Sequence, residues 1–187
     1  MQELYNVTYS DIIDLILEQN IVSIFQGKSE GGPRALGNRS ILFDPRNPYA
    51  KDIVNEVKKR EWYRPFAGTI LLECVNDWFD MRGLKESPFM MYAMNAWEDK
   101  GKYIPGIIHV DGTCRIQTVT EEQNSHYYNL IRCFFEKTEV PILFNTSFNL
   151  SGKVLVQTIY DAYETLQQSM IEYMYVPEEN KLVIVKN

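Results

Sequence analysis

Apolar residues recur along the chain in two patterns, helical spacing and short continuous runs. In residues 10–19 they lie three and four positions apart after a capping Ser10, which predicts an amphipathic helix. Short runs such as 22–26 and 141–145 predict buried strands. Helices are predicted at 10–19, 48–60, 121–137 and 157–170, and strands at 22–26, 40–44, 67–75, 87–96, 106–110, 115–119, 141–145, 172–176 and 181–186.

The order of these elements predicts a mixed α/β sheet, because strands and helices interleave without strict alternation. Asp111-Gly112 lies between two predicted strands and indicates a hairpin, whereas residues 30–37 are predicted as a loop with a helical turn. A chain of 187 residues with 45% hydrophobic residues is long enough for one domain with its own core, here 1–187.

Charge is distributed unevenly along the chain. Residues 28–64 contain nine Lys or Arg and five acids, although the whole chain has a formal net charge of −6. Gly31-Gly32-Pro33 allows a close backbone approach to a ligand, and arginine offers a planar fork that matches phosphate oxygens. This basic segment therefore predicts a site for a phosphorylated small molecule. Gly27-Lys28-Ser29 is no P-loop, because Val22 stands where that motif needs glycine, but we expect Lys28 to face the anion.

The main candidates for anion binding are Arg34, Arg39, Lys58, Arg60 and Arg64. The alternative is a solvated helix face with salt bridges, and we favour it for Lys51, Lys59 and Arg60. Arg34 and Arg64 lie among Pro, Gly and aromatic residues, where a merely solubilising charge is less expected, so we favour a binding role for these two.

Polar residues near two strand ends give further candidates. His109 and Asp111 lie on one side of an extended segment, and Arg115 follows just across the turn. Only one other histidine, His126, is present, so lining a pocket is favoured over a metal centre, and we assign no metal ligands.

Residues 145–149 follow a buried strand, where α/β sheets bind ligands, so Asn145, Ser147 and Asn149 could contact phosphate or ribose. An Asx or Ser/Thr turn that only closes the strand explains them equally well.

Several classes of protein are disfavoured. The acidic balance argues against broad nucleic-acid binding. Three widely spaced cysteines (Cys74, Cys114 and Cys133) indicate buried, reduced thiols and a cytoplasmic protein. No signal peptide and no membrane span is predicted.

Five motifs in this order resemble the C-terminal, YrdC-like domain of the O-carbamoyltransferases of nodulation-factor and antibiotic biosynthesis. They cover about residues 20–176 and are EGGPRALGNRSILFDPR (30–46), VKKREWYRPFAG (57–68), SPFMMY (87–92), IIHVDGTCRIQTV (107–119) and PILFNTSFNLSG (141–152). The resemblance implies a YrdC-like twisted mixed sheet flanked by helices. It also implies that this domain uses carbamoyl phosphate and ATP with Mg²⁺ to form carbamoyl adenylate and pyrophosphate.

On the matching positions, the resemblance implies roles for Arg34, Lys58, Arg64 and Arg115 as catalytic residues that hold phosphate and carbamoyl-phosphate oxygens. Asn145, Ser147 and Asn149 would line the nucleotide site with Lys28, Arg39, His109 and Asp111 nearby. The chain departs from the family at three places: Lys28 and Gly31 replace an Arg and an aromatic residue, Gly68 replaces Pro, and Lys153-Val154 replaces Glu-Pro.

The resemblance also implies a partner. In this family a metal-binding, actin-like domain transfers the carbamoyl group to a hydroxyl, and the five motifs leave no room for it here. We therefore expect such a domain or subunit to dock over the pocket, and this chain alone not to carbamoylate an acceptor. Two alternatives are an RNA-binding YrdC-like module and a nucleotide-binding subunit without its own catalysis.

Overall fold

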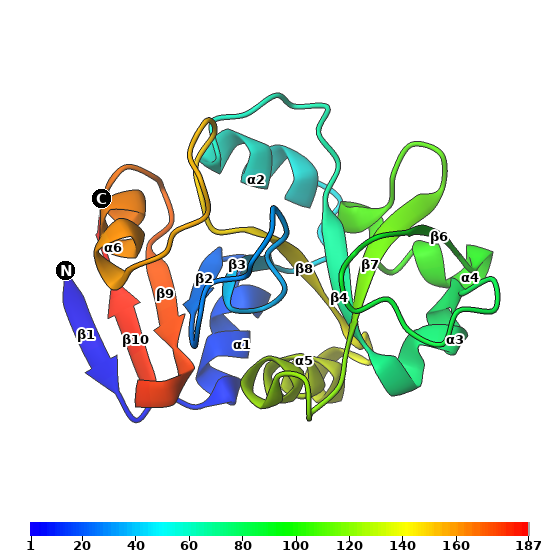
Figure 1. Ribbon diagram of the computed structural model, residues 1–187, viewed down its shortest axis with the longest axis horizontal. Helices are drawn as coiled ribbons and strands as arrows, with labels where there is room; N and C mark the ends of the chain where they lie inside the picture. Colours follow the sequence, from blue (N-terminus) through cyan, green and yellow to red (C-terminus); the bar gives the residue numbers. More distant parts are fainter. Residues whose placement is uncertain (187) are drawn as a thin grey trace.

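The computed structural model describes residues 1–186, which form one ten-stranded sheet in the order β1-β10-β9-β2-β3-β8-β4-β7-β6-β5 (Figure 1). The strands are β1 (Gln2–Tyr5), β2 (Val22–Phe25), β3 (Arg39–Phe43), β4 (Ala67–Leu71), β5 (Phe79–Asp80), β6 (Ala93–Ala96), β7 (Thr113–Val119), β8 (Ile142–Ser147), β9 (Tyr173–Val176) and β10 (Lys181–Ile184). The helices are α1 (Tyr9–Leu17), α2 (Ala50–Val57), α3 (Val75–Trp78), α4 (Glu98–Gly101), α5 (Ser125–Thr138) and α6 (Ile159–Gln167), with 3₁₀ turns at Leu72–Cys74, Pro105–Ile107 and Pro177–Glu179.

The sheet is mixed, as predicted. β2 pairs with β9 and β4 with β7 in parallel, whereas the other described pairs of neighbouring strands are antiparallel. The central strands β3, β4 and β8 are almost fully buried and supply much of the single apolar core. α5 packs on β4 and β8 and against α1, while α2 lies across the central strands from α5 in the view of Figure 1.

Helix α1 begins earlier than the sequence pattern suggests. Thr8, not Ser10, is its N-cap, and the Thr8 side chain and the Asp11 carboxylate form a capping box. The predicted apolar face is confirmed, because Ile12, Ile13 and Ile16 are all buried. Each of these side chains leaves water completely, which stabilises the fold by about 1.5–3 kcal/mol per side chain.

The predicted hairpin around Asp111-Gly112 is wrong, although the turn itself forms with Gly112 at φ +80°. Pro105–Ile107 is a 3₁₀ turn, and its Gly106 packs so closely that an added Cβ would lie 2.7 Å from Ala50 Cβ. β7 therefore pairs with β4 and β6 instead. Residues 87–92, predicted as strand, form a loop, and residues 30–37 form a bent loop without a helical turn.

Two strands also differ from the prediction. The strand predicted at 67–75 ends at Leu71 and continues as a 3₁₀ turn and α3, and the exposed strand β1 was not predicted because it lacks buried apolar positions.

The three cysteines are free thiols as expected, but only Cys114 is fully buried. Among the described residues, no helix combines the length and apolarity that crossing a membrane requires.

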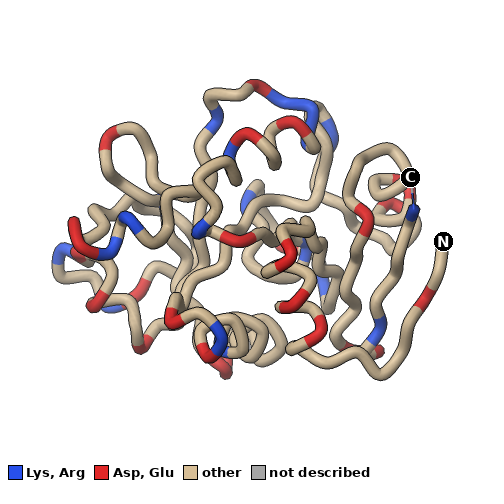
Figure 2. Tube along the Cα trace, turned by 180° about the vertical axis from the view of Figure 1, so that it is seen from behind, with Lys and Arg blue, Asp and Glu red and all other residues tan. Residues whose placement is uncertain are grey.

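Helix α2 ends three residues before the predicted end, and this difference shapes the site. Lys58 is the C-cap residue, and Lys59 adopts a left-handed conformation at φ +53°. The chain therefore turns sharply here, so that Lys58 is buried while the amine of Lys59 reaches the carbonyl of Gln168 on the surface. Figure 2 shows basic residues gathered along the segment between α2 and β4.

Candidate functional site

A cavity of about 550 Å³ opens where the ends of α2, β7 and β8 meet the loop before β3. Six of its lining side chains are basic: Arg34, Lys58, Arg60, Arg64, Arg115 and Lys153. Of the residues 1–186 that line it, none is Asp or Glu. Of these six, only Arg64 has an ion-pair partner among the described residues, so the other cations repel one another and make the cavity electrostatically attractive to an anion.

Lys58 is the most deeply buried of these cations, with 2% of its surface exposed. Its Nζ donates to the Ser147 carbonyl, to Asn149 Oδ1 at 3.0 Å and to Ser147 Oγ at 3.3 Å. Burial, with a smaller contribution from the charge of Arg60, lowers the pKa of Lys58 to about 7. Lys58 therefore fixes the turn after β8 and places a titratable positive charge at the wall of the cavity.

Arg115 projects from the start of β7, and its buried Nε has no hydrogen-bond partner in the described part of the chain. Burial, and then the charge of Arg34, lowers its pKa. An anion between these two guanidinium groups would remove their repulsion and satisfy the free N–H groups.

Arg60 is a cavity residue that the sequence analysis assigned to the surface. Its guanidinium carbon lies 4.8 Å from the centre of the Phe66 ring, and its buried Nε lacks a partner among the described residues. Burial lowers its pKa, and the charges of Arg64 and Arg115 lower it further. The left-handed Lys59 turns Arg60 inward, and the sequence gives no signal of this turn because a lysine, not a glycine, adopts the left-handed conformation.

Arg64 differs from the others because it has an acidic partner. Its Nε lies 2.7 Å from Glu61 Oε2, and both side chains are about half exposed. The loop that carries Arg60 and Arg64 is held by buried Asn55, whose Nδ2 donates to the carbonyls of Trp62 and Arg64 at 3.1 Å.

The loop that carries Arg34 is also held firmly. Glu30 Oε1 accepts from the backbone N–H groups of Leu36 at 2.7 Å and Asn38 at 2.8 Å. From the sheet side, Gln117 donates to the Leu36 carbonyl at 2.9 Å and Asn145 to the Ala35 carbonyl at 3.2 Å. These bonds to buried groups fix the loop before any ligand arrives.

Gly37 explains why this loop can approach the core so closely. Its φ is +109°, and an added Cβ would lie 2.2 Å from the ring of Tyr127. Any larger residue there would have to displace the ring or the loop.

The cavity brings together seven of the residues proposed from sequence: Arg34, Lys58, Arg64, Arg115, Asn145, Ser147 and Asn149. Lys28, Arg39, His109 and Asp111 do not line it. His109 Nε2 pairs with the Phe66 carbonyl at 3.0 Å, and Asp111 Oδ1 accepts from the Thr113 N–H at 3.0 Å. Both residues therefore shape the turn beside the cavity wall. Lys28 is exposed, and its carbonyl accepts from Asn38.

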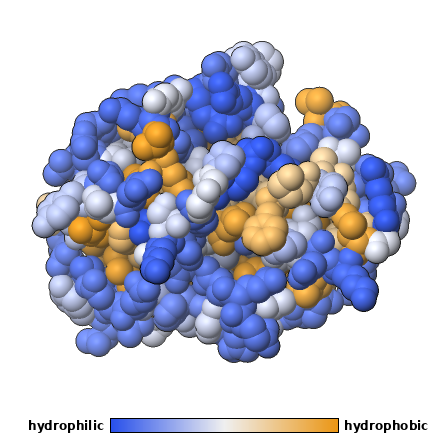
Figure 3. All heavy atoms as spheres, in the orientation of Figure 1, coloured by the Kyte–Doolittle hydropathy of each residue, from blue (hydrophilic) through white to orange (hydrophobic). Residues whose placement is uncertain are grey.

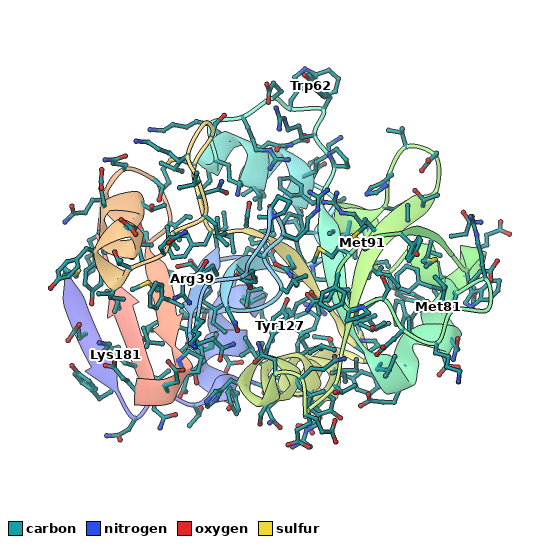
Figure 4. All side chains as sticks on the ribbon, in the orientation of Figure 1. Arg39, Trp62, Met81, Met91, Tyr127 and Lys181 are labelled. Atoms are coloured by element: carbon teal, nitrogen blue, oxygen red, sulfur yellow. The ribbon has the colours of Figure 1, made fainter. Side chains whose placement is uncertain are left out.

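Arg39 does not line the cavity and makes several contacts within the fold (Figure 4). Its guanidinium stacks 3.6 Å from the centre of the Phe25 ring and donates to backbone carbonyls of Gln26, Gly27, Asn38 and Gln157. These contacts favour a structural role, because both terminal nitrogens of the guanidinium already donate to backbone carbonyls, although its buried Nε has no partner among the described residues.

The fold has counterparts among solved structures. The chain is arranged like solved YrdC-like domains. Full-length HypF in its phosphate- and nucleotide-bound form matches with a TM-score of 0.60 at 18% identity, over 97% of this chain and 22% of that one. Sua5 of P. abyssi matches with a TM-score of 0.50 at 12% identity, over 90% of this chain and 52% of that chain. At such identities the likeness shows the fold alone.

Sequence similarity then places the chain in a family: it belongs to the Carbamoyltransferase C-terminus family, which matches residues 13–183. Nodulation protein NolO of Bradyrhizobium diazoefficiens is 43% identical over 169 residues, 89% of this chain and 31% of that protein. A 3'-hydroxymethylcephem-O-carbamoyltransferase of Amycolatopsis lactamdurans is 36% identical over 75% of this chain and 26% of that protein. The chain thus spans less than a third of these relatives.

Proposed function

We propose that the cationic cavity binds carbamoyl phosphate together with ATP and forms carbamoyl adenylate. Overall, carbamoyl phosphate, ATP and water would give carbamoyl adenylate, pyrophosphate and inorganic phosphate. The observation that carries the proposal is the set of six basic side chains facing one cavity with no acid among its described lining residues. Membership of a carbamoyltransferase family supports the carbamoyl group as the part transferred.

The proposed catalysis rests on position and charge. Arg34, Arg60 and Arg115 would hold phosphate oxygens and neutralise the charge that develops on the leaving pyrophosphate. Lys58 would act from the wall, with Ser147 and Asn149 oriented by its hydrogen bonds. An adjoining cavity of about 520 Å³ shares Ser147, Asn149 and Lys153 with the first and offers room for the rest of the nucleotide.

Mg²⁺ would enter with ATP. Residues 1–186 contain no group of three or more His, Cys, Asp or Glu placed to hold a metal ion, and the cationic cavity offers no carboxylate. The metal would therefore be carried by phosphate oxygens and would supply further charge neutralisation when bound.

Transfer to the final hydroxyl acceptor would require a second, metal-binding domain. A carbamoyl adenylate released into water would hydrolyse, so a closed route from the cavity to that domain is favoured. The expected acceptor is a hydroxyl. When this chain is incubated alone with ATP, Mg²⁺ and labelled carbamoyl phosphate, we expect no label to be transferred to candidate hydroxyl acceptors.

The proposal is tested by measuring products after mixing the purified chain with ATP, Mg²⁺ and carbamoyl phosphate. We expect pyrophosphate to appear only when all three are present, and Arg34→Ala with Arg115→Ala to abolish it. Binding of ATP without pyrophosphate release would indicate a nucleotide-binding module, and no binding at millimolar ATP would overturn the proposal.

A further inference from the structure

Two loops at the cavity mouth carry exposed apolar side chains. On the loop between α2 and β4, Trp62 is 72% exposed and Tyr63 63% exposed. On the loop before β6, Phe89 is 63% exposed and Met91 73% exposed. In Figure 4, Trp62 and Met91 lie on two sides of a region where nitrogen-tipped side chains gather, and Figure 3 shows orange and tan atoms beside the hydrophilic centre of this face.

Each loop alternates between the cavity and the outside. Arg60 and Arg64 line the cavity, whereas Trp62 and Tyr63 between them point to solvent. On the second loop Met90 lines the cavity and is 4% exposed, with its exposed neighbours on either side. A partner that covers the outer side chains would therefore also contact the two loops that carry the cavity residues.

Hydrogen bonds hold the backbones of the loops that carry these outer side chains. Asn55 holds the first loop through the carbonyls of Trp62 and Arg64, and the rings of Trp62 and Tyr63 pack edge to face at 5.9 Å. Ser87 ties the second loop to β7, since its N–H donates to Thr118 Oγ1 at 2.8 Å and its Oγ to the Ile116 carbonyl at 3.0 Å. Fixed, exposed aromatic and methionine side chains are typical of protein interfaces, where ordering costs are already met.

We propose that Trp62, Tyr63, Phe89 and Met91 form the docking surface for the carbamoyl-accepting transferase domain. This inference rests on the proposed function. Two observations identify the partner that would occupy this surface. Relatives such as NolO have more than two thirds of their length outside the matched part, and the matched part is the C-terminus of carbamoyltransferases. A domain seated on this rim closes the mouth from which the reactive adenylate would otherwise escape.

Site-specific photo-crosslinking tests the surface with the gene's full product in its own cells. p-Benzoylphenylalanine is introduced in place of Trp62, Met91 or, as a matched control, Tyr160, which is 80% exposed on α6. We expect the two rim positions to crosslink to one protein region, similar to the part of carbamoyltransferases outside the matched C-terminus, and the control position not to. Crosslinks to a second copy of this chain, to an unrelated protein or to nothing at both rim positions would overturn the inference.

A second measurement separates docking from chemistry. With the crosslinked region purified as its complete protein, Trp62→Ala and Met91→Ala should each weaken association by about tenfold or more, while Tyr160→Ala leaves it unchanged. The rim variants should retain the ATP affinity of the wild-type chain, since neither residue lines the cavity. Equal affinities of the rim and control variants for the partner would refute the proposed docking surface. If the proposed function alone is wrong, the wild-type chain would still bind the partner but would release no pyrophosphate.

Discussion

Arg39 and Arg115 are both largely buried arginines, yet their surroundings are opposite. Each has a buried Nε without a partner among the described residues. The terminal nitrogens of Arg39, however, donate to four backbone carbonyls and its guanidinium stacks on Phe25, whereas the guanidinium of Arg115 has no described hydrogen bond and faces the like charge of Arg34. A charged group satisfied by the protein stabilises the fold, and one left unsatisfied is available to a ligand. The partners of a buried cation, more than its place in a basic segment, therefore indicate its function.

The largest effect is expected from Arg39→Ala. Four carbonyls lose a charged donor, and the free energy of unfolding should fall by about 3 kcal/mol or more. Urea denaturation measures the change, and Arg39→Lys should recover only part of it because lysine lacks the planar fork. A stable Arg39→Ala protein with weakened ATP binding would reverse the roles of the two arginines.

Arg115→Ala and Arg34→Ala should show the opposite balance. Each should weaken ligand binding by about 1.5–3 kcal/mol, roughly 10- to 150-fold in Kd, without lowering stability, since each removes one of two repelling charges. Lys59→Ala is the matched control because the Lys59 amine donates to the Gln168 carbonyl on the surface. This variant should weaken ligand binding by less than about 1 kcal/mol. Equal losses in calorimetry for all three variants would indicate a diffuse charged face.

Lys58 gives an effect that depends on pH and is smaller within any one pH unit. Its pKa is about 7 in the folded protein and 10.5 when unperturbed, so between these values the unfolded chain retains a proton that the folded chain has lost. Stability should therefore rise with pH across this window, by at most about 1.4 kcal/mol per pH unit, relative to Lys58→Met. Denaturation of both proteins from pH 7 to 10 checks this, and parallel curves would show that Lys58 is not perturbed by burial.

Local patterns predicted the parts of the fold that depend on local chemistry. The apolar face of α1 and the buried strands β2, β3 and β8 follow directly from the spacing of their residues. The partner of β7 did not, because the parallel pairing with β4 joins segments about fifty residues apart and overrides the local hairpin signal.

The site was also predicted only in part, because local patterns show which charged residues are present but not which way they point in the folded chain. Arg34 and Arg64 were recognised by their Pro, Gly and aromatic neighbours, and both line the cavity. Arg60 was a candidate that the sequence analysis assigned to a solvated face, because its orientation depends on one left-handed residue, Lys59. Arg39 was included because its carbonyl partners are brought together only by folding. Sequence shows that charges are present, while tertiary structure decides which of them remain without partners.

The most direct test of the account is a crystal structure of the chain with carbamoyl phosphate and a non-hydrolysable ATP analogue. We predict phosphate groups inside the cavity, with oxygens within hydrogen-bond distance of Arg34, Arg60 and Arg115, while Arg39 keeps its four carbonyl partners. Phosphate groups bound elsewhere, with these three guanidinium groups still unpaired, would contradict the account.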